Sequence, residues 1–142
     1  MPAVGKGGYF GHRFEPRTPT VTQKIMYPAA DKPLHRIRPD LLGTVIPAEH
    51  GTLVRWAVAA GQPETPLHSH IEFEQITVLL EGRIRTRVGD EIFVLGPGDL
   101  IRIARGAQHG NTTALDDRDA IVLDIFMPPR PQYLEAARAE AS

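Results

Sequence analysis

The chain has 142 residues, 42% of them hydrophobic, so it is long enough for one compact domain with a buried core and short for two. Lysine and arginine (16) nearly balance aspartate and glutamate (17), and the formal net charge of −1 gives no electrostatic reason to expect a nucleic-acid partner. Cysteine is absent, which excludes a disulfide framework, a thiolate metal site and a cysteine nucleophile.

Residues 1–40 have a composition of their own. They contain six of the thirteen prolines, and four glycines fall within residues 5–11. Such a segment cannot build a core and is typical of an extended N-terminal arm. Within it, the β-prone stretch Thr20–Met26 is suited to the edge of a sheet, in the same chain or in a partner subunit. A loosely attached tail is the alternative.

Residues 41–130 have the pattern of an all-β domain. Short β-prone runs are separated by turn signals at Gly61, Gly82, Gly89–Asp90 and Gly96–Asp99. Strands of this length with turns this frequent predict an antiparallel sandwich or barrel. Residues 131–142 predict a short C-terminal helical tail, with Pro131 in its first turn.

Three histidines are the strongest chemical signal in this domain. His68 and His70 lie two residues apart, so on a strand both imidazoles would point to the same face. His109 opens a later predicted strand, which an antiparallel barrel can bring back beside the pair. Neutral imidazoles that converge in this way predict a site for a divalent metal ion.

Together these residues resemble the two motifs of the cupin family. The first motif reads here as Gly61, His68, His70, Gln75 and Gly82, and the second reads as Gly98, Ala104, Gly106 and His109. Ala104 stands where the family usually has proline. The resemblance implies a single cupin barrel, which is a double-stranded β-helix of jelly-roll type. It also implies metal ligands at His68, His70, Gln75 and His109.

The position of the fourth ligand is open between two neighbouring residues. Glu74 has the three-residue spacing from His70 and the same strand parity, and a carboxylate is the stronger ligand. Gln75 keeps the register to Gly82 but requires a turn or bulge after His70. We take Gln75 as the ligand and Glu74 as the alternative.

The stretch Asp124–Arg130 (DIFMPPR) predicts the rest of the site. An aspartate in the middle of an apolar strand is costly unless it is paired or functional, and Phe126 shares its face. Arg130 is suited to bind a carboxylate group of a substrate, or to form a structural ion pair with Asp124. With the histidines and Gln75, this ending is similar to the pectin-degradation cupins that ketonise 4,5-unsaturated uronates. That resemblance implies catalytic roles for Asp124 and Arg130 and substrate contacts for Phe126 and Arg130.

The sequence therefore predicts a metal-dependent isomerase or lyase-type enzyme that acts on a small carboxylated sugar or keto acid. The reaction implied by the resemblance is ring opening and tautomerisation of a 4,5-unsaturated uronate. An Fe(II)-dependent cupin dioxygenase and a non-catalytic small-molecule-binding cupin are the alternatives. The metal is Fe, Ni, Zn, Mn or Co, since imidazole and amide ligands suit all of them.

The expected partner is an anionic small molecule, with no nucleic acid. The family resemblance implies a homodimer. No apolar run follows the start of the sequence, and no stretch approaches the roughly 18 apolar residues of a membrane span. We therefore expect no membrane association and a cytoplasmic location.

Overall fold

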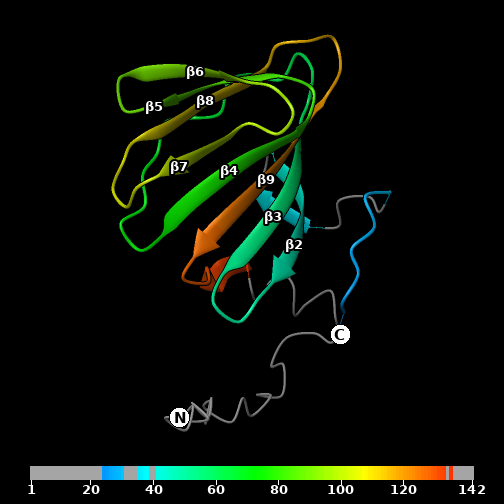
Figure 1. The fold of residues 1–142 in the computed structure, drawn as a ribbon, viewed down its shortest axis with the longest axis vertical. Coiled ribbons are helices and arrows are strands. Elements are labelled where there is room, and N and C mark those ends of the chain that lie inside the picture. The colour runs from blue at the N-terminus through cyan, green and yellow to red at the C-terminus, as the bar shows by residue number, and fades with distance from the viewer. Residues whose placement is uncertain (1–23, 31–34, 39–40, 134, 136–142) are drawn as a thin grey trace, which may run out of the picture.

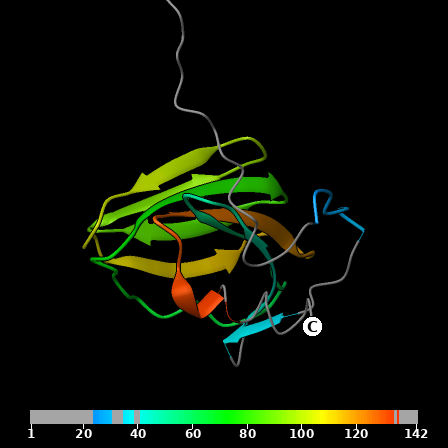
Figure 2. The same ribbon diagram turned by 90° about the horizontal axis from the view of Figure 1, so that it is seen from below.

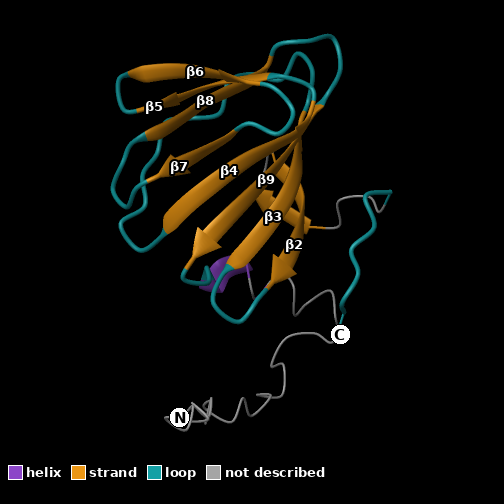
Figure 3. Cartoon of the chain, in the orientation of Figure 1, coloured by secondary structure: helices purple, strands orange, loops and turns teal. Residues whose placement is uncertain are grey.

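The computed structural model describes residues 24–30, 35–38, 41–133 and 135, and most of its regular structure is β-strand (Figures 1 and 3). Glycines with positive φ, Gly82 (78°) and Gly89 (58°), form the turns on either side of β5. The strands of the described residues are β1 (His35–Arg38), β2 (Leu41–Pro47), β3 (Thr52–Val58), β4 (Glu74–Glu81), β5 (Ile84–Val88), β6 (Glu91–Leu95), β7 (Leu100–Ile103), β8 (His109–Ala114) and β9 (Ala120–Met127).

The strands form two antiparallel sheets. The larger has the order β1-β2-β3-β9-β4-β7 and the smaller has the order β6-β5-β8. The last strand in the sequence, β9, lies between β3 and β4 at the centre of the larger sheet. This order confirms the predicted all-β, jelly-roll-like barrel.

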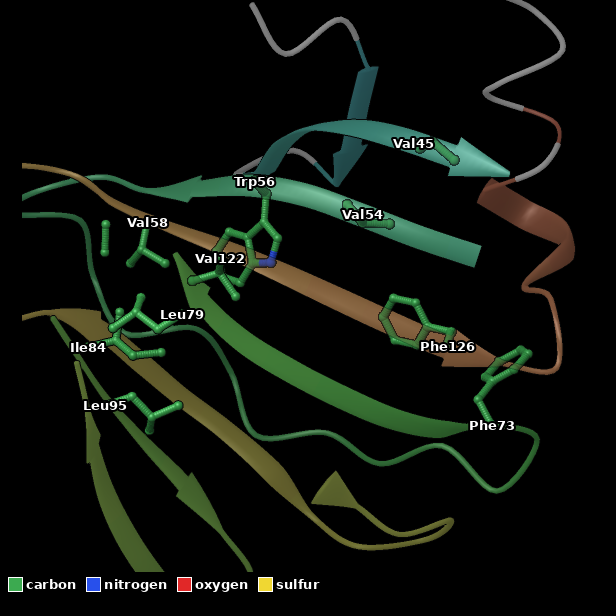
Figure 4. Packing of buried hydrophobic residues seen from close by; sticks show 11 residues of the cluster. Val45, Val54, Trp56, Val58, Phe73, Leu79, Ile84, Leu95, Val122 and Phe126 are labelled. Atoms are coloured by element: carbon green, nitrogen blue, oxygen red, sulfur yellow. The ribbon is translucent and has the colours of Figure 1, made fainter. Parts of the chain in front are cut away.

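The side chains between the sheets change character along the strands. At one end they are apolar: Val58, Leu79 and Val122 are fully buried and pack with Ile84 and Leu95 from the smaller sheet (Figure 4). Burying an aliphatic side chain of this size contributes about 1.5–3 kcal/mol, so this end stabilises the barrel.

Toward the other end of the same strands the buried side chains become polar. Thr52, Gln75, Thr77 and Asp124 are all buried there. Register explains their proximity, because Gln75 lies opposite Phe126 and Thr77 lies opposite Asp124 where β4 pairs with β9. One end of the barrel is therefore filled by aliphatic side chains, whereas the other end combines core residues such as Phe73 and Phe126 with groups capable of chemistry.

The segments outside the barrel depart in part from the sequence prediction. β1 falls within the predicted arm of residues 1–40 and pairs with β2 at the sheet edge. Of the predicted β-prone stretch, residues 20–23 lie outside the described residues, and Lys24–Met26 form no strand. Arg55 instead donates hydrogen bonds to the carbonyl oxygens of Tyr27 (3.1 Å) and Pro28 (2.8 Å).

A short helical turn at residues 131–133 follows β9, as predicted for the start of the C-terminal tail. It lies at the lower end of the strands in Figure 1 and in front of them in Figure 2. Residue 134 and residues 136–142 lie outside the described residues. The predicted domain boundaries at residues 40 and 130 stay predictions.

Candidate metal centre

Backbone hydrogen bonds connect the segment that carries His68 and His70 to β8. The amide of His68 donates to the carbonyl of His109 and the amide of His109 donates to the carbonyl of His68, each at 2.8 Å. Thr65 accepts from the amide of Asn111 at 2.8 Å, one step further along β8. The sequence prediction placed both histidines on a strand, whereas His68 makes one isolated bridge and His70 lies in the following loop.

Gly110 allows this segment to approach β8 closely. Its φ is 135°, and a Cβ built on it would collide with the carbonyl oxygen of Pro66. The next part of the segment is also held, because the amide of Gly106 donates to the carbonyl of His70 at 2.6 Å. The sequence therefore needs glycine at position 110 to bring the His68–His70 loop against the start of β8.

The three imidazoles converge as a metal site requires. Their ring centroids lie 4.3–5.1 Å apart, and one possible ligand atom from each ring lies within 4.8 Å of the others. Nδ1 of His68 is 3.0 Å from the carbonyl of Pro66, and Nδ1 of His109 is 2.9 Å from that of Ala107. With the proton on Nδ1 in these hydrogen bonds, Nε2 keeps a lone pair for a metal ion.

The structure separates the two candidates for the fourth ligand. Gln75 is buried and lines the same cavity as the histidines, whereas Glu74 points to the opposite face of β4 and accepts a hydrogen bond from Arg102 at 2.8 Å. β4 begins only at Glu74, after a bend at residues 71–72, and this bend changes the parity between His70 and Gln75. Gln75 is therefore the residue in position to join the histidines.

A metal ion would satisfy buried atoms that have no protein partner. Nε2 of His70, Nε2 of His109 and Oε1 of Gln75 are all buried without a hydrogen bond. Buried polar atoms are nearly always partnered in folded proteins, because leaving one unsatisfied is costly. All three atoms are metal-ligand types and all line one cavity, so the residues fit a divalent metal.

Electrostatics keeps two of the imidazoles neutral. Burial lowers the pKa of His70 to about 4, helped by the positive charge of Arg130 and the other two histidines and opposed by Glu72. Burial also lowers the pKa of His109, against the raising effect of its hydrogen bond to Ala107. Both rings therefore stay uncharged near neutral pH, which is the form that binds metal ions.

Asp124 lies in the wall of the same cavity, which has a volume of about 320 Å³. Its carboxylate is buried, and two described side chains donate hydrogen bonds to it. Oδ2 accepts from Nε1 of Trp56 at 2.8 Å, and Oδ1 accepts from Oγ1 of Thr77 at 2.7 Å. These bonds compensate for burying the carboxylate and hold it in one orientation.

Arg130 lies among aromatic rings in the wall of the cavity. The central carbon of its guanidinium is 4.3 Å from the ring centroid of Tyr133, 4.7 Å from that of Phe126 and 5.1 Å from that of Phe73. Its backbone amide donates to Oγ1 of Thr52 at 3.0 Å. Phe126, predicted to contact substrate, therefore also packs against the guanidinium.

The family of the chain follows from comparison with known domains. A model of the cupin domain matches residues 54–126. The chain belongs to the cupin family. No curated protein matched the sequence.

Solved structures share the cupin fold at low sequence identity. KdgF from a Halomonas species is 23% identical, with a TM-score of 0.61 over 68% of this chain and 86% of that one. An RmlC-like cupin from Shewanella frigidimarina is 20% identical, with a TM-score of 0.66 over 80% of this chain and 97% of that one. TT1209 from Thermus thermophilus is 26% identical, with a TM-score of 0.58 over 68% and 92% of the two chains.

The structure brings together all the site residues that the sequence predicted: His68, His70, Gln75, His109, Asp124, Phe126 and Arg130 line one cavity. Sequence reasoning missed Trp56 and Thr77, which hold Asp124, and Phe73 and Tyr133, which contact Arg130. The alternation of inward-facing residues, which includes Trp56 and Thr77 on their strands, was the available signal.

Among the described residues of this cupin, no helix has the length and apolar character to span a membrane.

Proposed function

We propose that this cupin is a metal-dependent enzyme that isomerises a small carboxylated sugar or keto acid. The observation that carries the proposal is the set of buried, unsatisfied ligand atoms of His70, His109 and Gln75, which line the same cavity as Asp124 and Arg130. A site that held only a structural metal would not need a carboxylate and a guanidinium beside it. These are the groups that bind an anion and move a proton.

Arg130 is the proposed anchor for the carboxylate of the substrate. The aromatic rings of Phe73, Phe126 and Tyr133 pack near its guanidinium, which is a planar group suited to pair with a carboxylate. Of the site's histidines, His70 and His109 are neutral at pH 7, and none of the proposed ligands carries a negative charge. A divalent metal ion held by such ligands, together with Arg130, would outweigh the single negative charge of Asp124, so the cavity favours an anion.

Asp124 is the proposed proton carrier. The hydrogen bonds from Trp56 and Thr77 orient its carboxylate toward one position in the cavity. In a ring-opening tautomerisation one proton leaves a hydroxyl oxygen and one is gained by carbon, so the reaction needs no oxidant or reductant. A metal ion bound by the three histidines and Gln75 would polarise an oxygen atom of the bound substrate.

A 4,5-unsaturated uronate is the substrate that we propose. The site residues resemble those of the pectin-degradation cupins, and a cavity of about 320 Å³ lies at the small end of the range for ligand sites, as suits a monosaccharide. This sugar also carries the carboxylate that Arg130 would hold. Imidazole and amide ligands suit Fe, Ni, Zn, Mn and Co alike, so the proposal extends to any of these metals.

The test follows the ultraviolet absorbance of a 4,5-unsaturated monouronate mixed with metal-loaded protein. We expect absorbance to fall faster than the spontaneous rate with the native protein and with Arg83→Ala, whose side chain forms an exposed ion pair with Asp116. His109→Ala should show only the spontaneous rate. No acceleration by the native protein would reject the uronate, and iron content with oxygen uptake would then test the dioxygenase alternative.

A further inference from the structure

A chain of hydrogen bonds links the proposed oxygen ligand to the buried carboxylate. Nε2 of Gln75 donates to Oγ1 of Thr77 at 3.0 Å, Oγ1 of Thr77 donates to Oδ1 of Asp124 at 2.7 Å, and Nε1 of Trp56 donates to Oδ2 of Asp124 at 2.8 Å. Gln75, Thr77 and Asp124 are each buried, and Trp56 is only 7% exposed. Little of this chain of hydrogen bonds is therefore exposed at the surface of the protein.

The direction of every bond in this chain is determined by its two end groups. An indole N–H can only donate, and a carboxylate can only accept. Thr77 has one hydroxyl proton, and it gives that proton to Asp124, so it can only accept from Gln75. The amide of Gln75 must then turn its NH2 group toward Thr77, which leaves Oε1 facing the cavity without a partner.

We infer that Trp56, Asp124 and Thr77 are positioning residues that set which atom Gln75 presents to the metal ion. This inference rests on the proposed metal site and assigns those side chains a role in ligand orientation. An amide can present either its oxygen or its NH2 group, and only the oxygen can bind a cation. The chain of hydrogen bonds selects the oxygen.

The same chain compensates part of the charge of the metal. The proposed ligands are three neutral imidazoles and one neutral amide, and Asp124 is the carboxylate connected to them. Because hydrogen-bonded groups polarise one another, the negative charge of Asp124 strengthens the Thr77–Gln75 bond and increases the electron density on Oε1. Asp124 therefore supports metal binding without touching the metal.

Replacing Asp124 with asparagine should reverse the chain. Because Trp56 can only donate, the asparagine oxygen must face the indole, and its NH2 group must face Thr77. Thr77 then accepts from residue 124 and donates its proton to Gln75. Gln75 must turn its oxygen toward Thr77 and its NH2 group toward the metal. Removing the indole with Trp56→Phe lets the asparagine oxygen face Thr77 again, and the original direction returns.

The experiment measures the Co²⁺ affinity of metal-free full-length protein by competition titration, together with the visible spectrum of the bound Co²⁺. D124N should bind Co²⁺ about tenfold more weakly than native protein and change the spectrum. The double variant W56F/D124N should lose clearly less affinity relative to W56F than D124N loses relative to the native protein, because the direction of the chain returns and only the charge of Asp124 stays missing. T77V should weaken binding like D124N. T44V removes the hydroxyl of another buried threonine, which lies on β2 and does not line the cavity, and it should match the native protein.

Two results would overturn the inference while leaving the metal site in place. One is that D124N loses as much Co²⁺ affinity relative to the native protein as W56F/D124N loses relative to W56F. The other is equal affinity in T77V and T44V, which decides the question even where D124N fails to fold. Failure of native protein to bind Co²⁺ would instead reject both the inference and the proposed function.

Discussion

Replacing Gly110 with alanine should separate the two halves of the metal site. The new Cβ would meet the carbonyl oxygen of Pro66, which is a backbone atom and cannot rotate away. The segment that carries His68 must then move, and its two backbone hydrogen bonds to His109, each 2.8 Å, would be lost. At about 1 kcal/mol each, these bonds account for about 2 kcal/mol. Alanine at a φ of 135° adds about 1–3 kcal/mol of backbone strain, for a total of about 3–5 kcal/mol.

The matched control for Gly110→Ala is Gly98→Ala. Gly98 also has a positive φ (90°), but a Cβ there would have no neighbouring atom within 4 Å. It therefore isolates the cost of backbone strain from the cost of the collision. Urea denaturation of both metal-free variants gives the difference in free energy of unfolding, and Co²⁺ titration gives the effect on the site. Equal stability and equal metal affinity in the two variants would refute the argument that Gly110 holds His68 against β8.

Four further outcomes can be measured. The pKa of His70 is about 4 in the folded protein, against an ordinary value of 6.5. As the pH falls, the unfolded chain therefore takes up a proton before the folded protein does. The metal-free protein should for this reason lose stability between pH 6.5 and pH 4. His70→Gln should reduce that slope in denaturation curves, and an unchanged slope would contradict the burial argument. Co²⁺ at 100 times its dissociation constant should raise the free energy of unfolding by about 2.7 kcal/mol, and no rise in melting temperature would contradict metal binding to the folded state. Arg130→Lys, which lacks the planar fork, should raise the KM for the 4,5-unsaturated uronate about tenfold, and an unchanged KM would reject Arg130 as the anchor. Light scattering should give twice the chain mass of 15.6 kDa if the proposed homodimer forms.

The grouping of the histidines and Gln75 around one cavity could be predicted because their spacing carries the information. The His-x-His pair and His109 occur at fixed separations from glycines that form turns, and Gly98 and Gly106 do have positive φ (90° and 78°). The choice between Glu74 and Gln75 depended on a bend at residues 71–72 that period-2 alternation does not predict. Parity counted from His70 therefore favoured the wrong face of β4.

The partners of Asp124 and Arg130 could not be predicted for a different reason. Trp56 comes from β3 and Thr77 from β4, so their contacts with Asp124 depend on the pairing of three strands that are far apart in the sequence. A tryptophan in an alternating strand is also typical of an ordinary core residue. Strand order and register supply the missing information, and single-sequence patterns do not contain them.

The apolar sequence of β9, at the centre of the larger sheet, does not indicate which face of the strand is buried. β9 (AIVLDIFM) is apolar on both faces, since Ile121, Leu123 and Ile125 alternate with the buried residues. A shift of one residue would exchange the two faces at almost no hydrophobic cost, except that Asp124 would lose its indole and hydroxyl donors. Asp124 therefore distinguishes the native register of β9 from the shifted one, because only the native register pairs its carboxylate with Trp56 and Thr77.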